Sequence, residues 1–431
     1  MSNRVIKVDA LARVEGEGSL YVRVKDNEIK EVRFGIFEPP RFFEAFLQGR
    51  HFMEVPDITA RICGICPIAY QMGAIQAMEN AFGVEVPGPI RDLRRLIYCG
   101  EWIESHALHV YMLHAPDFLG LSDAIQLAKS NRDLVQKALR LKKIGNDLLE
   151  AVGGGRAIHP VNMRVGGFFR TPRKAEIRAL IPDLEWAIQA SHDTIRLVGG
   201  FNFPDIEQNY TFVSLRHDRE YAIHEGRVVS NRGLDIGLPE FLDHFDEEHV
   251  KHSNALHGFQ KPGKQPYHVG PLARYAINYD RLHPETLSAA KSAGLGPVVR
   301  NPFQSIVVRS LEILQVCLDA LTIAKNYEEP DQPHTEPVVR AAVGYGATEA
   351  PRGLCFHRYE IDDQGLVKTA RIMPPTAQNQ KIIESDLWKV VAAHLSLPDE
   401  DLKWRCEQAI RNYDPCISCA THFLKLTVDR E

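Results

Sequence analysis

Residues 412–431 read NYDPCISCATHFLKLTVDRE, a stretch in which Cys416 and Cys419 form a Cys-x-x-Cys pair. Two thiols at this spacing can bind one soft metal ion, but they supply only two of its ligands. A second pair, Cys63 and Cys66, lies far upstream in the motif RICGICP. Four thiolates from these distant segments would complete one site. The sequence therefore predicts a metal centre that joins the two segments, with the intervening chain as its scaffold.

The composition is that of an ordinary globular chain. Of its 431 residues, 44% are hydrophobic and 25% are charged, so it has neither the charge excess nor the apolar depletion of a disordered protein. The net charge of -5 argues against a nucleic-acid partner, which would require a basic surface. Eight cysteines in so long a chain favour metal or redox chemistry over a disulfide framework.

Two features of the sequence bear on its location. No apolar run reaches the roughly eighteen residues of a membrane helix, so we expect no membrane span. The first residues, MSNRVIK, lack the apolar core of a signal peptide. Together these features predict a cytoplasmic protein.

The hydrophobic pattern predicts a mainly α fold, a single large helical domain with small antiparallel β-sheets. Residues 4–37 alternate apolar and polar side chains around a turn at Asp26-Asn27, as in an antiparallel sheet or hairpin. A second small sheet is expected around residues 350–370. Because no internal repeat or linker is evident, we expect one intertwined domain over residues 1–431.

The predicted domain has four parts. They are a β-rich segment over 1–40, a helical core over 41–200, an irregular layer of loops and short strands over 201–300, and helices with the metal-binding segment over 301–431. Helical periodicity begins near residue 41 and further predicts helices over 71–82, 91–114, 122–153, 174–199, 303–327, 382–395 and 399–411, with Ser122 as the cap of the third.

Spacing alone leaves two kinds of metal site open. Four thiolates also suit a structural zinc site, which is as well supported by spacing as a catalytic centre. Three features favour catalysis. The pairs lie far apart, whereas small zinc modules keep their ligands local; arginine, aspartate and glutamate flank both pairs; and the scaffold is too large to need a metal for folding.

The other candidate residues are ordinary when each is considered alone. Glu15 would be a solvated strand residue, Glu44 lies on a mixed helix face, Asp117 would be a cap or turn residue, and Arg352 a surface turn residue. Three histidines have the spacing of one helix face and are expected in the core or on the surface: His106, His109 and His114. The remaining cysteines are isolated, so we expect buried, inert thiols: Cys99, Cys317, Cys355 and Cys406.

The combination is far more specific. RICGIC at 61–66 together with DPCISCATH at 414–422 resembles the large, catalytic subunit of nickel–iron hydrogenases. The resemblance runs nearly end to end and includes RVEG at 13–16, GGR at 154–156 with His159-Pro160, VGPLAR at 269–274, APRG at 350–353 and PTAQN at 375–379. It is strongest to the cytoplasmic, cofactor-coupled group. One departure is Tyr70, at a position where many relatives have histidine.

The resemblance implies reversible heterolytic cleavage of dihydrogen at a nickel–iron centre. Cys63 and Cys416 would be terminal nickel ligands, while Cys66 and Cys419 would bridge nickel to an iron that carries carbon monoxide and cyanide. Thiolates are soft ligands that can hold nickel through changes of oxidation state. A terminal thiolate would accept the proton, and Glu15 would relay it outward.

The resemblance also assigns residues around the centre. Arg352, Asp117 and Asp414 would surround it, with a guanidinium over the open coordination position. A magnesium-like ion (Mg2+) would be held by Glu44, His422 and the backbone carbonyl of Ile372.

Electrons must leave through a partner. The remaining cysteines lack the spacing of an iron–sulfur motif, so we expect no iron–sulfur cluster in this chain. The resemblance implies an iron–sulfur small subunit, and further diaphorase-type subunits carrying flavin or iron–sulfur clusters that reduce NAD(P) or a similar soluble acceptor.

Alternatives remain for both activity and processing. A hydrogen-sensing, non-catalytic homologue would keep all four cysteines, and a structural zinc protein would bind zinc in place of nickel.

In most of the family a protease cuts after the histidine that matches His422, so we expect that cut here. The alternating pattern of residues 423–431 would also suit a retained edge strand.

Overall fold

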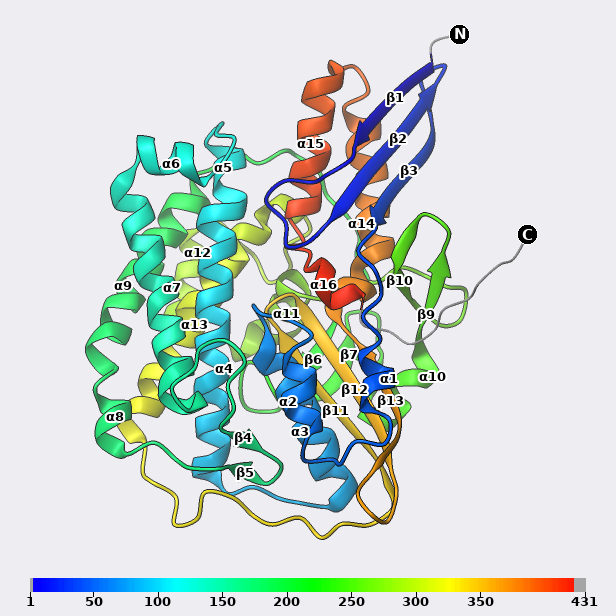
Figure 1. The fold of residues 1–431 in the computed structure, drawn as a ribbon. Coiled ribbons are helices and arrows are strands. Elements are labelled where there is room, and N and C mark those ends of the chain that lie inside the picture. The colour runs from blue at the N-terminus through cyan, green and yellow to red at the C-terminus, as the bar shows by residue number, and fades with distance from the viewer. Residues whose placement is uncertain (1–2, 422–431) are drawn as a thin grey trace.

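The computed structural model describes residues 3–421. A helical layer and several small antiparallel sheets lie side by side, and the segment around α16 (Ile417–Ala420) lies between them (Figure 1). The main hydrophobic core includes residues from Ile6 to Ala420. The predicted mainly α fold with small sheets is confirmed.

The first sheet consists of three strands in the order β1 (Asn3–Val8), β2 (Gly18–Lys25) and β3 (Glu28–Ile36), all antiparallel. Asp26 and Asn27 form the predicted turn, both with positive φ, which suits a two-residue hairpin loop. Helices α14 (Pro375–Ala393) and α15 (Asp399–Arg411) pack against this sheet. The long loop between β1 and β2 carries Glu15 into the molecule.

The helical layer contains α3 (Pro67–Phe82), α4 (Gly88–Leu108), α7 (Arg132–Gly153), α9 (Ile181–Gly199) and α13 (Ser305–Asn326). Helices α4 and α7 cross at a pair of glycines. A Cβ added to Gly145 would lie 2.6 Å from the Gly100 carbonyl oxygen, and one on Gly100 would lie 2.8 Å from the Gly145 oxygen. The two backbones are therefore in direct contact.

Some predicted helix boundaries are wrong. The helix expected over 122–153 is two helices, α6 (Ala124–Ser130) and α7. The backbone of Asn131 is not helical, and its side chain caps α7 through the Leu134 amide. The cap of α6 is Asp123 rather than Ser122.

The helix expected over 174–199 is also divided, into α8 (Lys174–Arg178) and α9. Pro182 in the first turn of α9 has no amide hydrogen with which to continue the preceding helix. Helix α14 begins seven residues before the predicted start, and α4 continues through a π-helical turn at 109–114 into α5 (Ala115–Phe118). The layer at 201–300 also contains the helices α11 (Pro271–Asn278) and α12 (Pro284–Ser292). Its predicted short strands are β6 (Val213–Arg216), β7 (Arg227–Ser230), β8 (Asp235–Ile236), β9 (Phe245–Val250) and β10 (Ser253–Gln260).

The sheet near residues 350–370 positions the site. Its strands are β11 (Ala342–Ala350), β12 (Gly353–Ile361) and β13 (Val367–Met373), in that order and antiparallel. It lies directly on α3, since a Cβ on Gly344 or Gly346 would overlap the backbone of α3 at the Ala77 or Gly73 carbonyl. This contact fixes the turn between β11 and β12 relative to the start of α3.

Candidate metal centre

The four predicted cysteine ligands converge in one buried group. All four side chains are buried, and their sulfur atoms lie within 4.8 Å of one another. The Sγ atoms of Cys63 and Cys416 are 3.5 Å apart, those of Cys66 and Cys419 are 3.6 Å apart, and those of Cys416 and Cys419 are 3.0 Å apart. These separations exceed the roughly 2.05 Å of a disulfide bond and suit ligands of a shared centre.

The first pair is held by the start of α3. Cys66 caps this helix, and Pro67 in its first turn needs no amide partner. The Cys63 sulfur accepts hydrogen bonds from the amides of Ile65 and Cys66, at 3.3 and 3.2 Å. Glu101 on α4 is completely buried. Its carboxylate accepts hydrogen bonds from the amides of Ile68 and Ala69 in the first turn of α3, at 2.6 and 3.2 Å. This carboxylate anchors the turn that presents the first pair.

The second pair is held by two separate elements. The Cys416 amide donates to the Thr376 hydroxyl at the start of α14, at 3.1 Å. Cys416 also forms a parallel bridge with Glu15, whose carbonyl accepts from the Ile417 amide at 3.1 Å. The loop between β1 and β2 and the segment before α16 therefore lie side by side.

The proximity of the four thiols perturbs their acidity. Hydrogen bonds from the other thiols, first that of Cys416, lower the pKa of the Cys63 thiol. The same network raises the pKa of the Cys66 and Cys416 thiols. Metal ions bind thiolates, so a cation bound by these cysteines would displace their protons.

Arg352 lies beside the thiols in the turn between β11 and β12. It is 2% exposed and donates from Nε to the Asp414 carbonyl at 2.6 Å and from Nη2 to the Asp414 carboxylate at 3.1 Å. Burial opposes its charge, but Asp414 and the nearby thiolates raise its pKa. Within residues 3–421, Nη1 of Arg352 and Oδ2 of Asp414 have no hydrogen-bond partner. One donor and one acceptor thus remain available to a group bound at the thiols.

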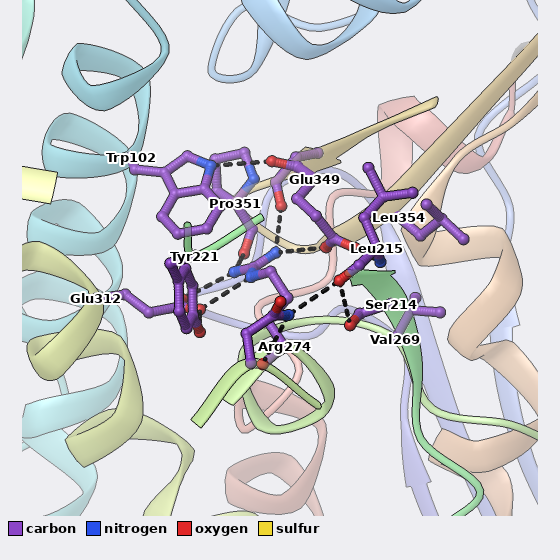
Figure 2. Close-up of polar contacts among 12 residues, drawn as sticks. Trp102, Ser214, Leu215, Tyr221, Val269, Arg274, Glu312, Glu349, Pro351 and Leu354 are labelled. Atoms are coloured by element: carbon purple, nitrogen blue, oxygen red, sulfur yellow. Dashed lines mark hydrogen bonds and ion pairs between the residues drawn. The ribbon is translucent and has the colours of Figure 1, made fainter. Parts of the chain in front are cut away.

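A buried arginine network supports this turn (Figure 2). Arg274 on α11 donates to Glu312 at 2.9 and 2.8 Å, to Glu349 at 3.2 Å, and to the carbonyls of the two residues that precede Arg352, at 2.6 and 2.8 Å. Its guanidinium lies 4.2 Å from the centre of the Trp102 ring. Arg274 therefore fixes the backbone from which Arg352 extends.

Asp117 is buried and binds two arginines. Its carboxylate accepts from Arg13 and from Nε and Nη2 of Arg411, the latter two at 2.7 and 2.8 Å. In the described part of the chain it makes no hydrogen bond to any of the four cysteines. Its contacts join the loop after β1 to the end of α15, immediately before the segment that carries the second cysteine pair.

Glu15 lies at the edge of the site and is half-buried. Its carboxylate accepts from the Ser418 amide at 3.0 Å and from the Ser418 hydroxyl, which also lies 3.5 Å from Glu38. Gly16, with a φ of 89°, lets the loop approach closely, since a Cβ here would lie 2.6 Å from Ile417. Glu15 and Glu38 thereby share the Ser418 hydroxyl, one residue before Cys419.

The predicted magnesium-like site is described only in part. Glu44 is buried, and its carboxylate accepts from the Ile372 amide at 2.8 Å. His422 lies outside the described residues, as do the positions that would follow the expected cleavage. The structure thus brings Glu44 and Ile372 together.

Three residues that support the site were not singled out from the sequence: Glu101, Arg274 and Thr376. No spacing rule marks them, although two of them lie in the quoted segments 269–274 and 375–379. The isolated cysteines are buried as predicted, and burial raises the pKa of Cys317 and Cys406 to about 12. The histidines near residue 110 are core residues, and His106 bonds Glu312 at 2.9 Å.

The fold and the site define a class of protein, a helical metalloprotein with a buried centre of four soft thiolate donors from distant segments. The sulfur separations and the absence of disulfides among them fit the nickel–iron centre that the resemblance implies. The family described as nickel-dependent hydrogenase matches residues 41–171 and 260–422. The chain therefore belongs to the nickel-dependent hydrogenases, a family of oxidoreductases, and is similar to their large, catalytic subunits.

Individual relatives are hydrogenase subunits as well. The chain is 32% identical to the sulfhydrogenase 1 subunit alpha of Pyrococcus furiosus over 428 residues, which cover 98% of each chain. It is 26% identical to the NAD-reducing hydrogenase HoxS subunit beta of Cupriavidus necator, over 98% of this chain and 95% of that one. A solved NAD+-reducing NiFe-hydrogenase in its H2-reduced state matches with a TM-score of 0.88 and 27% identity, over 97% of this chain and 99% of that one.

One further observation concerns membranes. Among residues 3–421, no helix combines the length and the apolar character needed to cross a bilayer.

Proposed function

We propose that this hydrogenase subunit cleaves dihydrogen reversibly and passes the electrons through an iron–sulfur small subunit to NAD(P) or a similar soluble acceptor. The convergence of four thiols beside a buried arginine carries the proposal for the site. The likeness to a sulfhydrogenase and to an NAD-reducing hydrogenase supports the choice of acceptor. Diaphorase-type partners and a cytoplasmic location remain predictions on the same grounds.

Cys63, Cys66, Cys416 and Cys419 would together hold nickel and iron, and Cys63 or Cys416 would be the terminal thiolate. When bound, the centre supplies the heterolytic cleavage of dihydrogen, and its iron would carry carbon monoxide and cyanide. The chain contributes the base. A terminal thiolate accepts the proton, and Glu15 transfers it outward through its contacts with Ser418.

The residues around the thiols would orient the centre. Arg352, whose Nη1 has no partner within residues 3–421, would bind a ligand of the metals, and Asp414 would hold the guanidinium in place. Asp117 would act indirectly. It binds the Arg411 side chain and so holds the segment after Arg411, which carries Cys416 and Cys419. Glu44, the Ile372 carbonyl and His422 would hold a magnesium-like ion, since hard oxygen ligands suit magnesium.

Metal analysis tests the proposal most directly. The purified complex is expected to contain nickel and iron, with infrared bands of iron-bound carbon monoxide and cyanide, and to oxidise hydrogen with an artificial dye. Zinc in place of nickel would overturn it in favour of a structural site. A complete nickel–iron centre with negligible dye reduction would identify a hydrogen sensor.

Replacing Arg352 by lysine is expected to leave nickel and iron in place but to reduce the rate of hydrogen oxidation by about tenfold or more. Lysine keeps the charge but loses the planar fork that binds Asp414 at two points. Metal content and dye-linked activity check the result. The matched control is Arg358→Lys, on β12, the strand that follows Arg352. In the described structure the Arg358 side chain bonds only Thr369, so this variant should be near parental. An Arg352→Lys enzyme that oxidises hydrogen at the parental rate would show that Arg352 has only a structural role in the turn.

A separate prediction concerns cleavage of the chain after His422. Active enzyme is expected to end at His422, because removal of the residues beyond it would free a new carboxylate beside the magnesium-like ion. Intact-mass measurement of active, nickel-loaded protein checks this. A full-length mass with nickel and turnover would instead make residues 423–431 part of the mature enzyme.

A further inference from the structure

Two further groups of possible metal ligands occur in the described chain: His252, His257 and Glu384, and His217, Glu220 and Glu225. The first group, called here the His252 group, lies where the turn between β9 (Phe245–Val250) and β10 (Ser253–Gln260) meets α14. Its ligand atoms lie within 4.8 Å of one another. Helix α14 packs on both β10 and β3 at this junction.

The buried member of the His252 group is His257. It is 1% exposed, and its Nε2 has no hydrogen-bond partner within residues 3–421. Burial lowers its pKa to about 4, although Glu384 opposes the shift, so the ring is neutral at physiological pH and keeps a lone pair. A buried, unpaired imidazole nitrogen is costly unless something binds it.

Glu384 and His252 supply the other two donors. The Glu384 Oε1 atom accepts from the His252 ring at 2.7 Å and from the Phe34 amide at 3.0 Å. The amide contact orients the carboxylate, as outer hydrogen bonds commonly do for metal ligands. Both side chains remain about one-fifth exposed, which allows an ion and a water molecule to enter.

Charge separates this group from the second one. Glu220 and Glu225 are already paired with Arg91, and Glu220 also with Arg95 at 3.0 Å. In this second group the arginine side chains therefore already neutralise the carboxylates that a metal ion would need. Near the His252 group, the Lys381 ammonium is instead paired with Glu248 at 2.5 Å. The carboxylate of Glu384 therefore has no lysine or arginine partner in the described structure.

We propose that His252, His257 and Glu384 form a second metal site that binds one zinc-class divalent cation, with water completing the coordination. Two imidazoles and one carboxylate form a donor set typical of zinc and unsuited to magnesium or calcium. Ligand atoms around tetrahedral zinc are about 3.3 Å apart. Separations of up to 4.8 Å therefore need to close by at most about 1.5 Å, and the 2.7 Å between His252 and Glu384 needs to open by about 0.6 Å. An ion bound at the His252 nitrogen takes the place of the hydrogen that this nitrogen donates to Glu384, and that hydrogen moves through solvent to the other ring nitrogen.

Such an ion would tie the β9–β10 turn to α14. The same helix begins at Pro375, and its Thr376 hydroxyl accepts from the Cys416 amide. Zinc would thus stabilise α14 without contacting the four thiols.

The test uses the complete hydrogenase complex, equilibrated with micromolar Zn2+ and then dialysed. Zinc and nickel are measured per complex, and X-ray absorption at the zinc edge identifies the ligands. We expect His252→Asn and Glu384→Gln each to weaken zinc binding at least about tenfold with nickel unchanged, and the parent zinc to have nitrogen and oxygen ligands.

The control is His217→Asn in the second group, which should retain the parental zinc. His252→Asn and Glu384→Gln both change side chains that are about one-fifth exposed and lie at the surface, so loss of folding, which would appear as loss of nickel, is not expected. Parental zinc retention in both variants, or zinc bound by sulfur alone, would overturn the proposal.

Discussion

Replacing Cys419 by serine is expected to remove nickel and hydrogen oxidation together, to the background of the assays. The Cys419 sulfur lies 3.0 Å from that of Cys416 and 3.6 Å from that of Cys66, so its loss leaves a gap shared by both pairs. A serine hydroxyl is a hard donor that keeps its proton at neutral pH and cannot replace a soft thiolate. Nickel and iron per chain and dye-linked hydrogen oxidation check the result.

Cys406→Ser is the matched control for this variant. Cys406 is also fully buried, but it lies on α15 apart from the thiol group. It should keep both metals and most activity, whatever its modest effect on stability. A Cys419→Ser enzyme that retains full turnover would remove Cys419 from the centre.

Replacing Glu15 by glutamine is expected to leave the metals in place and to lower turnover by about a hundredfold or more. Glutamine preserves the size of the side chain and can still contact the Ser418 hydroxyl, but it cannot accept and release a proton. The measurement is dye-linked hydrogen oxidation beside nickel and iron content.

Glu17→Gln is the control for the proton relay. Glu17 is close to Glu15 in sequence, but its side chain is exposed. Near-parental activity is therefore expected. If Glu15→Gln also stays within a few fold of the parent, the relay lies elsewhere. Glu38, 3.5 Å from the Ser418 hydroxyl, is then the first carboxylate to change, ahead of Glu17.

The sequence predicted those parts of the protein that depend on local patterns or on a motif. Alternation and the Asp26-Asn27 turn identified the first sheet. The paired cysteines predicted the group of four thiols that the structure brings together, although its partners lie 353 positions apart. Helix interruptions were missed because they depend on single residues, Asn131 and Pro182, within otherwise periodic stretches.

Supporting residues were harder to predict. Arg352 alone suggested an exposed turn, but the turn is buried because Arg274 binds its carbonyls from a different helix. Glu101 reads as one more charge on an amphipathic helix, and only the position of α3 shows that it caps the turn after Cys66. Such roles arise from tertiary contacts, which no periodicity encodes.

The separation of the two cysteine pairs has a consequence for biosynthesis. Chains emerge at about 5–20 residues per second, so the 353 residues between Cys66 and Cys419 correspond to about 20–70 s of translation. During that interval the first pair has only two thiols to offer, and Arg352 lacks Asp414. The nascent chain therefore has a half-formed site whose thiols are open to oxidation or to the wrong ion until its last segment is made.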